Sequence, residues 1–299
     1  MRQKPYFGQL MTAMVTFFNE DGSLNAEGTA DFAAWLLDHG SDAVLVSGTT
    51  GEAPTMTVAE KEELFTRVIA KVNGRGPVIV GTGSNNTADV LKMNQLAEKV
   101  GADGVLVVGP YYNKPSQEGF YQHFKTIAQH TKLPIIIYNV PGRTGKNIEP
   151  ETIARLAKEC PNIVAVKEAS GNIAQAAKLH RLAPKDFSIY SGDDGLILPL
   201  MSVGAVGLIS VLSNVNGQLL KDLMQAYVKG DVEKATALND VMVPQADSMF
   251  LVSNPIPIKE AVTKMTPFNA GVYRLPMCPM TPAEREKVTA AWKASGLLQ

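Results

Sequence analysis

The chain has 299 residues, of which 45% are hydrophobic and 19% are charged. This composition is typical of one or two globular domains with their own core and excludes a disordered chain. The 28 Lys and Arg residues nearly balance the 29 Asp and Glu residues, so no overall field attracts nucleic acid or an acidic membrane. The two cysteines, Cys160 and Cys278, exclude a disulfide framework and a C-x-x-C site.

Two segments bear on where the protein works. Residues 1–8 lack an apolar stretch, so we expect no secretory signal and a cytoplasmic protein. The uncharged stretch 195–220 is long enough to be considered as a membrane span. Because Pro199, Gly204 and Gly207 interrupt it, we instead predict a buried helix, a turn and a buried strand, and no membrane partner.

Eight short runs rich in β-branched residues alternate with longer amphipathic segments. Most runs are continuously apolar, which is typical of strands that are buried on both faces. The predicted strands are residues 8–16, 43–46, 78–81, 104–108, 135–140, 164–167, 188–190 and 207–211.

Helix signals lie between these runs. Thr57 and Glu60 have the spacing of a capping box that opens a helix. Further helices are predicted at 88–100 after Thr87 and before Gly101, at 116–127 opened by Ser116, at 150–159 opened by Glu149-Pro150, and at 173–182 after Asn172. Strands that alternate with helices at this spacing predict repeated β-α units in a parallel sheet.

Eight β-α units within residues 1–230 predict an α/β protein with a (β/α)8 TIM barrel. A doubly wound nucleotide fold would require a Gly-x-Gly-x-x-Gly turn, which does not follow the first strand. The strand runs stop beyond Gly230. Helical patterns at 232–243, 245–252, 257–265 and 282–292 predict that residues 231–299 form a helical C-terminal region packed on the barrel.

Active sites of such barrels lie where strands end. The second strand is followed by Ser47-Gly48-Thr49-Thr50-Gly51-Glu52, whose backbone N–H groups could hold a carboxylate or phosphate. An ordinary glycine-rich turn explains this segment equally well. The fourth strand is followed by Tyr111 and Tyr112 between prolines, where a packing or interface patch is the favoured interpretation.

Residues that could take part in catalysis lie at or after the ends of the fifth and sixth predicted strands. Tyr138 lies late in one apolar run and Arg143 follows that run, whereas Lys167 ends the next run. A phenol can relay protons, a guanidinium suits carboxylates, and a desolvated lysine can form a Schiff base. The alternatives are a core tyrosine, a solvated arginine and a lysine that extends to water.

Other candidates have simpler explanations. Asp193 and Asp194 are predicted to cap the next helix, and Ile209 and Ser210 either line a pocket or fill the barrel. The four histidines lack metal-ligand spacing, so surface or helix-end positions are favoured and no metal is expected. A Gly-x-Ser-x-Gly elbow is also missing. The lysine, tyrosine, arginine and glycine-rich loop at one barrel mouth together describe an imine-forming lyase of a keto acid.

Six motifs in order resemble the dihydrodipicolinate synthase/N-acetylneuraminate lyase family of class I aldolases, over nearly the whole chain. They are residues 48–52, 110–113, 138–144, 166–170, 191–194 and 254–259. The resemblance is strongest to the synthase branch, and it implies that pyruvate condenses with L-aspartate 4-semialdehyde in lysine and diaminopimelate biosynthesis. It also implies a homotetramer, built as a dimer of dimers, with no organic cofactor.

The resemblance implies a role for each matching residue. Lys167 would bind pyruvate, and Tyr138 would move protons through Thr49 and a Tyr112 contributed by a neighbouring subunit. Arg143 would hold the semialdehyde carboxylate, while Thr50, Gly192 and Ile209 would line the pyruvate pocket. A possible lysine-regulatory site would comprise Ala53, Val58, Lys61, Asn85, Asp89 and Tyr111.

Two other functions stay open on the sequence. The first is a pyruvate-dependent aldolase of a sialic acid or a 2-keto-3-deoxy sugar acid, although family members of that kind generally lack an arginine at the position of Arg143. The second is a barrel without catalytic activity that binds small acids. In the regulatory site, Val58 and Lys61 replace frequent histidines and Asp89 replaces a glutamate, so we expect lysine inhibition to be weak or absent.

Overall fold

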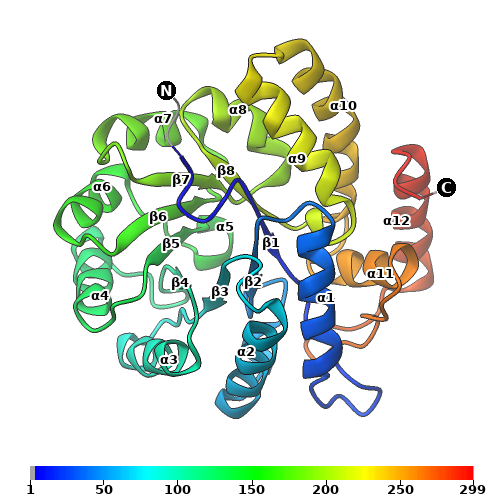
Figure 1. The fold of residues 1–299 in the computed structure, drawn as a ribbon, viewed down its shortest axis with the longest axis horizontal. Coiled ribbons are helices and arrows are strands. Elements are labelled where there is room, and N and C mark those ends of the chain that lie inside the picture. The colour runs from blue at the N-terminus through cyan, green and yellow to red at the C-terminus, as the bar shows by residue number, and fades with distance from the viewer. Residues whose placement is uncertain (1–3, 299) are drawn as a thin grey trace.

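The computed structural model describes residues 4–298 and contains the predicted closed barrel (Figure 1). Residues 1–3, part of the segment considered for a secretory signal, lie outside the described residues. Each strand pairs in parallel with the next, and β8 closes the barrel against β1 through the partners Met11 and Ile209. The strands are β1 Leu10–Ala13, β2 Ala43–Val46, β3 Val78–Gly81, β4 Gly104–Val108, β5 Ile135–Asn139, β6 Ile163–Glu168, β7 Ser188–Ser191 and β8 Gly207–Ser210.

The helices surround the barrel, and the C-terminal ones lie to one side of it, next to α1 and α9 (Figure 1). The barrel helices are α1 Ala26–Asp38, α2 Val58–Val72, α3 Thr87–Val100, α4 Gln117–Gln129, α5 Pro141–Thr144, α6 Pro150–Glu159, α7 Ile173–Leu182, α8 Ile197–Ser202 and α9 Ser213–Lys229, with the short 3-10 helices η1 Ala53–Thr55 and η2 Asp194–Leu196. The C-terminal helices are α10 Val232–Ser248, α11 Ile256–Met265 and α12 Pro282–Ala294.

Strand side chains divide between two apolar cores. In β5, Ile135 and Ile137 face the layer between strands and helices, whereas Ile136 and Tyr138 belong to the core inside the barrel. Successive side chains of a strand point to opposite faces, so every second residue points into the barrel. The last inward side chain of each strand therefore lies at the mouth of the barrel, where chemistry can occur.

The predicted strands are confirmed within a few residues, and so are most helix signals. The capping box of Thr57 and Glu60 is present, and Ser116 and Asn172 cap α4 and α7. One boundary was wrong, because α3 begins at Thr87 and its cap is Asn86. The helix-turn-strand prediction for the uncharged stretch is also confirmed by α8 and β8. No helix within residues 4–298 is long and apolar enough to cross a membrane.

The predicted break near Pro244 was wrong. Helix α10 runs through this proline as one element from Val232 to Ser248. A proline inside a helix removes one backbone hydrogen bond and usually interrupts the helix. Packing overrides it here, because Met242 and Ala246 on either side of the proline are buried in the core and α10 packs along α9. The division into domains at residue 230 stays a prediction.

The histidine prediction was wrong for one residue. His39 and His130 lie at helix ends and His180 lies in the last turn of α7, as expected. His123, however, is buried in the middle of α4, where its Nδ1 lies 2.9 Å from the hydroxyl of Thr87. Burial lowers its pKa to about 4, so the ring is neutral near pH 7 and serves as a core residue.

Candidate active site

The register between two strands brings the predicted lysine and tyrosine together. Tyr138 of β5 and Lys167 of β6 are direct partners across the parallel ladder, and both side chains point to the barrel mouth. The Lys167 Nζ lies 4.5 Å from the centre of the Tyr138 ring. Lys167 is only 5% exposed, which excludes the alternative that it extends to bulk water.

Burial also prepares the lysine for nucleophilic attack. It lowers the pKa of Lys167 to about 8, because removal from water disfavours the ammonium form; nearby Asp194 opposes this shift and nearby Arg143 adds to it. A neutral amine is the form that attacks a carbonyl. At neutral pH the lysine is thus close to the point at which it becomes reactive.

This pKa predicts how imine formation depends on pH. A fall in pH protonates Lys167, so we expect kcat/KM for a keto acid to fall about tenfold for each unit below pH 8 and to level off above it. The measurement is a steady-state pH profile at subsaturating keto acid, with the second substrate saturating. A profile that stays flat from pH 6 to 8 would contradict this assignment of the titrating group.

Tyr138 has the surroundings of a proton-transfer group. It is 7% exposed, and burial raises the pKa of its phenol. The charge of Arg143 and a hydrogen bond with the Thr49 side chain both oppose that shift. Arg143 lies on α5, directly after β5. Together with Tyr138 and Lys167 it lines a small cavity at the barrel mouth. The phenol therefore stays protonated near neutral pH and has a hydroxyl partner for proton exchange.

The loop after β2 brings Thr49 and Thr50 to this cavity. Two residues of the loop that are not glycine, Ser47 and Glu52, have positive φ values of 57° and 53°. Such left-handed conformations are unfavourable for most side chains and persist where the surroundings hold them. Asn254 holds Thr50 by donating its Nδ2 to Oγ1 at 3.1 Å.

Glu52 anchors the end of this loop through a buried ion pair. Its Oε1 lies 2.5 Å from Nζ of Lys259 on α11, and the side chains are 1% and 0% exposed. Its Oε2 accepts a hydrogen bond from the backbone N–H of Arg274 at 3.1 Å, and Lys259 also donates to the carbonyl of Val272. The C-terminal region is thus joined to the loop by a fully buried ion pair and two partly buried hydrogen bonds.

The buried pair predicts a stability loss. Lys259→Met keeps most of the side-chain volume but leaves the Glu52 carboxylate without its cation. We expect the free energy of unfolding to fall by about 3–5 kcal/mol, as for other broken buried pairs, measured by urea denaturation. The double variant Glu52→Gln, Lys259→Met removes both charges and is expected to lose less. A loss below about 1 kcal/mol in the single variant would contradict the role of the pair.

Gly192 and Asp194 border the lysine from the loop after β7. A Cβ on Gly192 would lie 3.0 Å from both Cγ and Cε of Lys167, so the absence of a side chain gives the lysine its space. Asp193 caps η2, as predicted. Asp194 is buried instead, and its carboxylate accepts hydrogen bonds from the Ser210 hydroxyl and from the Val211 N–H.

Two residues that were predicted for the active site, Ile209 and Tyr112, do not line the cavity at the barrel mouth. Ile209 is fully buried in the barrel core and is not among the residues that line the cavity. Tyr112 is 90% exposed with φ of 71°. It does not line the cavity of its own chain.

The six positions of the possible regulatory site lie on or next to η1, α2 and α3 and in the loop after β4. Val58 is 60% exposed and Tyr111 is 40% exposed. Asn113 follows Tyr111 closely and donates its side-chain amide to the carbonyl of Asn85, which links two of the loops. Asp89 already accepts a hydrogen bond from Asn86.

Sequence reasoning missed three residues around the lysine. Phe250 and Asn254 line the cavity from the C-terminal region, and Asp194 was interpreted as a cap. Asn254 belongs to one of the recognised motifs, and that motif was the one signal for it. Phe250 has no signal of its own, because it lies in an irregular segment far along the chain from the other lining residues.

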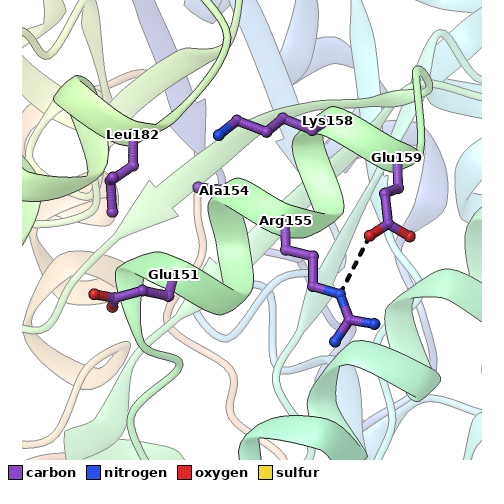
Figure 2. Close-up of a pocket in the computed structure, with 6 residues that line it drawn as sticks. All are labelled: Glu151, Ala154, Arg155, Lys158, Glu159 and Leu182. Carbon is purple, nitrogen blue, oxygen red and sulfur yellow. Dashed lines mark hydrogen bonds and ion pairs between the residues drawn. The ribbon is translucent and has the colours of Figure 1, made fainter.

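A larger hollow lies outside the barrel but has less suitable chemistry. It measures about 320 Å³ between α6 and α7, against about 40 Å³ for the cavity at the barrel mouth. Its lining residues are Glu151, Ala154, Arg155, Lys158, Glu159 and Leu182 (Figure 2). Arg155 points toward Glu159, its ion-pair partner (Figure 2), and the hollow has no desolvated nucleophile. Chemistry rather than size therefore identifies the barrel mouth as the candidate site.

Comparisons with known proteins find relatives over nearly the whole length of the chain. A family model described as the dihydrodipicolinate synthetase family matches residues 6–295. A protein of Moorella thermoacetica named 4-hydroxy-tetrahydrodipicolinate synthase is 51% identical over 98% of this chain and 99% of its own. A dihydrodipicolinate synthase structure from Cyanidioschyzon merolae with lysine bound has a TM-score of 0.95 at 41% identity, covering 99% of this chain and 100% of its own. The chloride-inhibited synthase of Acinetobacter baumannii complexed with pyruvate has a TM-score of 0.92 at 37% identity, covering 97% and 99%.

Proposed function

Because the chain belongs to the dihydrodipicolinate synthetase family, we propose that it condenses pyruvate with L-aspartate 4-semialdehyde to 4-hydroxy-tetrahydrodipicolinate. This reaction is the first committed step of lysine and diaminopimelate biosynthesis. The observation that carries the proposal is the buried Lys167 beside Tyr138 at the barrel mouth. The pyruvate complex of the Acinetobacter baumannii relative supports pyruvate as the first substrate.

The geometry supports a Schiff-base mechanism. The neutral Nζ of Lys167 attacks the ketone carbon of pyruvate, and water leaves as the imine forms. The loop of Thr49 and Thr50 holds the pyruvate carboxylate, and Gly192 leaves room for it beside the lysine. Tyr138 donates and accepts the protons of these steps, with Thr49 as its hydrogen-bond partner.

The second half-reaction forms the carbon–carbon bond. The imine loses a proton to become an enamine, whose carbon adds to the aldehyde carbon of the semialdehyde. The amino group of the adduct then displaces Lys167 as the ring closes, so that one water is released overall. Arg143 holds the carboxylate of the semialdehyde. A guanidinium at this point suits this small acid better than the hydroxylated chain of a sugar acid.

A direct assay tests the proposal. We expect turnover of pyruvate with L-aspartate 4-semialdehyde, and rates at least about a hundredfold lower with sialic acid or with 2-keto-3-deoxy sugar acids. Formation of 4-hydroxy-tetrahydrodipicolinate can be followed with a coupled reductase. Faster cleavage of a sugar acid would transfer the assignment to the aldolase alternative.

The proposed assembly is a cytoplasmic homotetramer in which Tyr112 completes the site of a neighbouring subunit. The 90% exposure of this tyrosine in a loop beside the barrel mouth supports such a contact. Sedimentation measures the assembly. A fully active monomer would overturn the shared site.

We expect lysine to inhibit weakly or not at all, although the structure of the Cyanidioschyzon merolae relative has lysine bound. At the matching positions, Lys61 would repel the ammonium of the ligand, and Asp89 is one methylene shorter than the common glutamate. Burial lowers the pKa of Lys61, which reduces this repulsion as pH rises. Steady-state rates with added lysine test the expectation, and inhibition at submillimolar lysine would contradict it.

A further inference from the structure

The cavity at the barrel mouth is rich in hydrogen-bond donors. Lys167 and Arg143 line it, and a charged lysine or arginine side chain has no acceptor. The Tyr138 phenol is already hydrogen-bonded with Thr49. Among the described side chains that line the cavity, Asn254 is the one with a carbonyl oxygen.

In the Asn254 side-chain amide, the nitrogen has a hydrogen-bond partner and the oxygen has none. The residue is 5% exposed, and its Nδ2 donates to Thr50 Oγ1 at 3.1 Å, which fixes the orientation of the amide. Its Oδ1 is buried without a hydrogen-bond partner. Buried polar atoms nearly always have a partner, and leaving one open costs free energy. An unpartnered acceptor in a residue that lines a ligand cavity indicates that the ligand supplies the donor.

The two substrates differ in what they can donate. Pyruvate brings a carboxylate and a ketone, which are acceptors. L-aspartate 4-semialdehyde brings a carboxylate, an aldehyde and an ammonium group, and of these the ammonium donates. We propose that Oδ1 of Asn254 accepts a hydrogen bond from the amino group of the second substrate and is a specificity-determining residue. This inference rests on the proposed function and names the group by which its second substrate is recognised.

The contact also serves ring closure. After the carbon–carbon bond has formed, the amino group loses a proton and its lone pair attacks the iminium carbon on Lys167. The new carbon–nitrogen bond forms, and the bond from that carbon to Nζ breaks, releasing the lysine. Asn254 and Lys167 line the same cavity. An amino group that is hydrogen-bonded to Oδ1 therefore stays in the cavity that contains the iminium carbon on Lys167, which it must attack.

Succinate semialdehyde separates recognition of the amino group from other effects, because it lacks only that group. Because it has no amino group to displace Lys167, its adduct stays bound to the lysine. The adduct can be reduced with borohydride and quantified by mass spectrometry. The measured quantity is the half-saturating succinate semialdehyde concentration for this adduct, divided by KM for aspartate semialdehyde. We expect Asn254→Leu to lower this ratio about 10- to 100-fold, in the range of a hydrogen bond to a charged group.

Two variants complete the experiment. Asn254→Asp keeps an acceptor and adds a charge, so its ratio should equal or exceed that of the parent. Asn239→Leu is the matched control, because Asn239 on α10 also has a buried oxygen without a partner but does not line the cavity. Its ratio should not change.

An unchanged ratio in Asn254→Leu, or a ratio in Asn254→Asp as low as that expected for leucine, overturns the inference. If Asn254→Leu does not fold, the aspartate variant decides by the same criterion. A parent that traps pyruvate but does not turn over aspartate semialdehyde would instead reject the proposed function.

Discussion

Lys167→Ala is expected to abolish capture of pyruvate and all turnover. The reaction requires a covalent bond between an amine and the ketone carbon, and alanine offers no nucleophile. Incubation with pyruvate and borohydride, followed by mass spectrometry, should add one reduced pyruvoyl group to the parent chain at Lys167 and none to the variant. Burial lowers the pKa of Lys167 to about 8, which makes it far more reactive near neutral pH than an exposed lysine.

The matched control is Lys158→Ala. Lys158 lines the outer hollow between α6 and α7 (Figure 2) and does not line the cavity at the barrel mouth. This variant should trap pyruvate as the parent does. Capture of pyruvate by the Lys167→Ala chain, or a parent whose Lys167 stays unmodified, would reject the Schiff-base mechanism and favour a barrel that binds small acids without catalysis.

Tyr138→Phe is expected to fold normally and to lose about 10²–10⁴-fold in kcat, the usual contribution of a general acid–base group. The substitution keeps the ring that packs in the barrel core and beside Nζ of Lys167. It removes the hydroxyl that hydrogen-bonds with Thr49 and that we propose as the proton-transfer group. The measurement is steady-state kinetics, with circular dichroism to confirm the fold.

Tyr6→Phe provides the control for loss of a phenol hydroxyl. Tyr6 is 52% exposed and does not line the cavity, so its variant should keep the parental rate. A near-parental rate in Tyr138→Phe would mean that another group relays the protons and that the role of Thr49 must be reconsidered with it.

The fold and the central pair of the site could be predicted because both depend on local patterns. Continuous apolar runs indicate strands buried on both faces, and eight of them with intervening helices fit a closed barrel. In such a barrel the end of each strand lies at the mouth. Tyr138 lies near the end of one predicted strand and Lys167 ends the next, so their proximity at the barrel mouth could be predicted from the order of the strands.

Contacts across long sequence separations could not be predicted from patterns. Glu52 and Lys259 are more than 200 positions apart and pair in the core, yet each of them in the sequence is an ordinary charged residue. Asn254 reaches Thr50 over a similar separation. Local sequence patterns do not predict which helix of the C-terminal region packs on which loop of the barrel.

The sequence by itself determined the strand order, the barrel and the position of the lysine that we propose as the nucleophile, because hydrophobic periodicity and strand-end positions are local properties. Tertiary structure decided how these residues are held and tuned. Packing carried α10 through Pro244 and buried His123, and docking of the C-terminal region placed Asn254 in the cavity. The physical reason is that burial, which sets pKa values and the need for hydrogen-bond partners, depends on neighbours that the folded chain brings from far away.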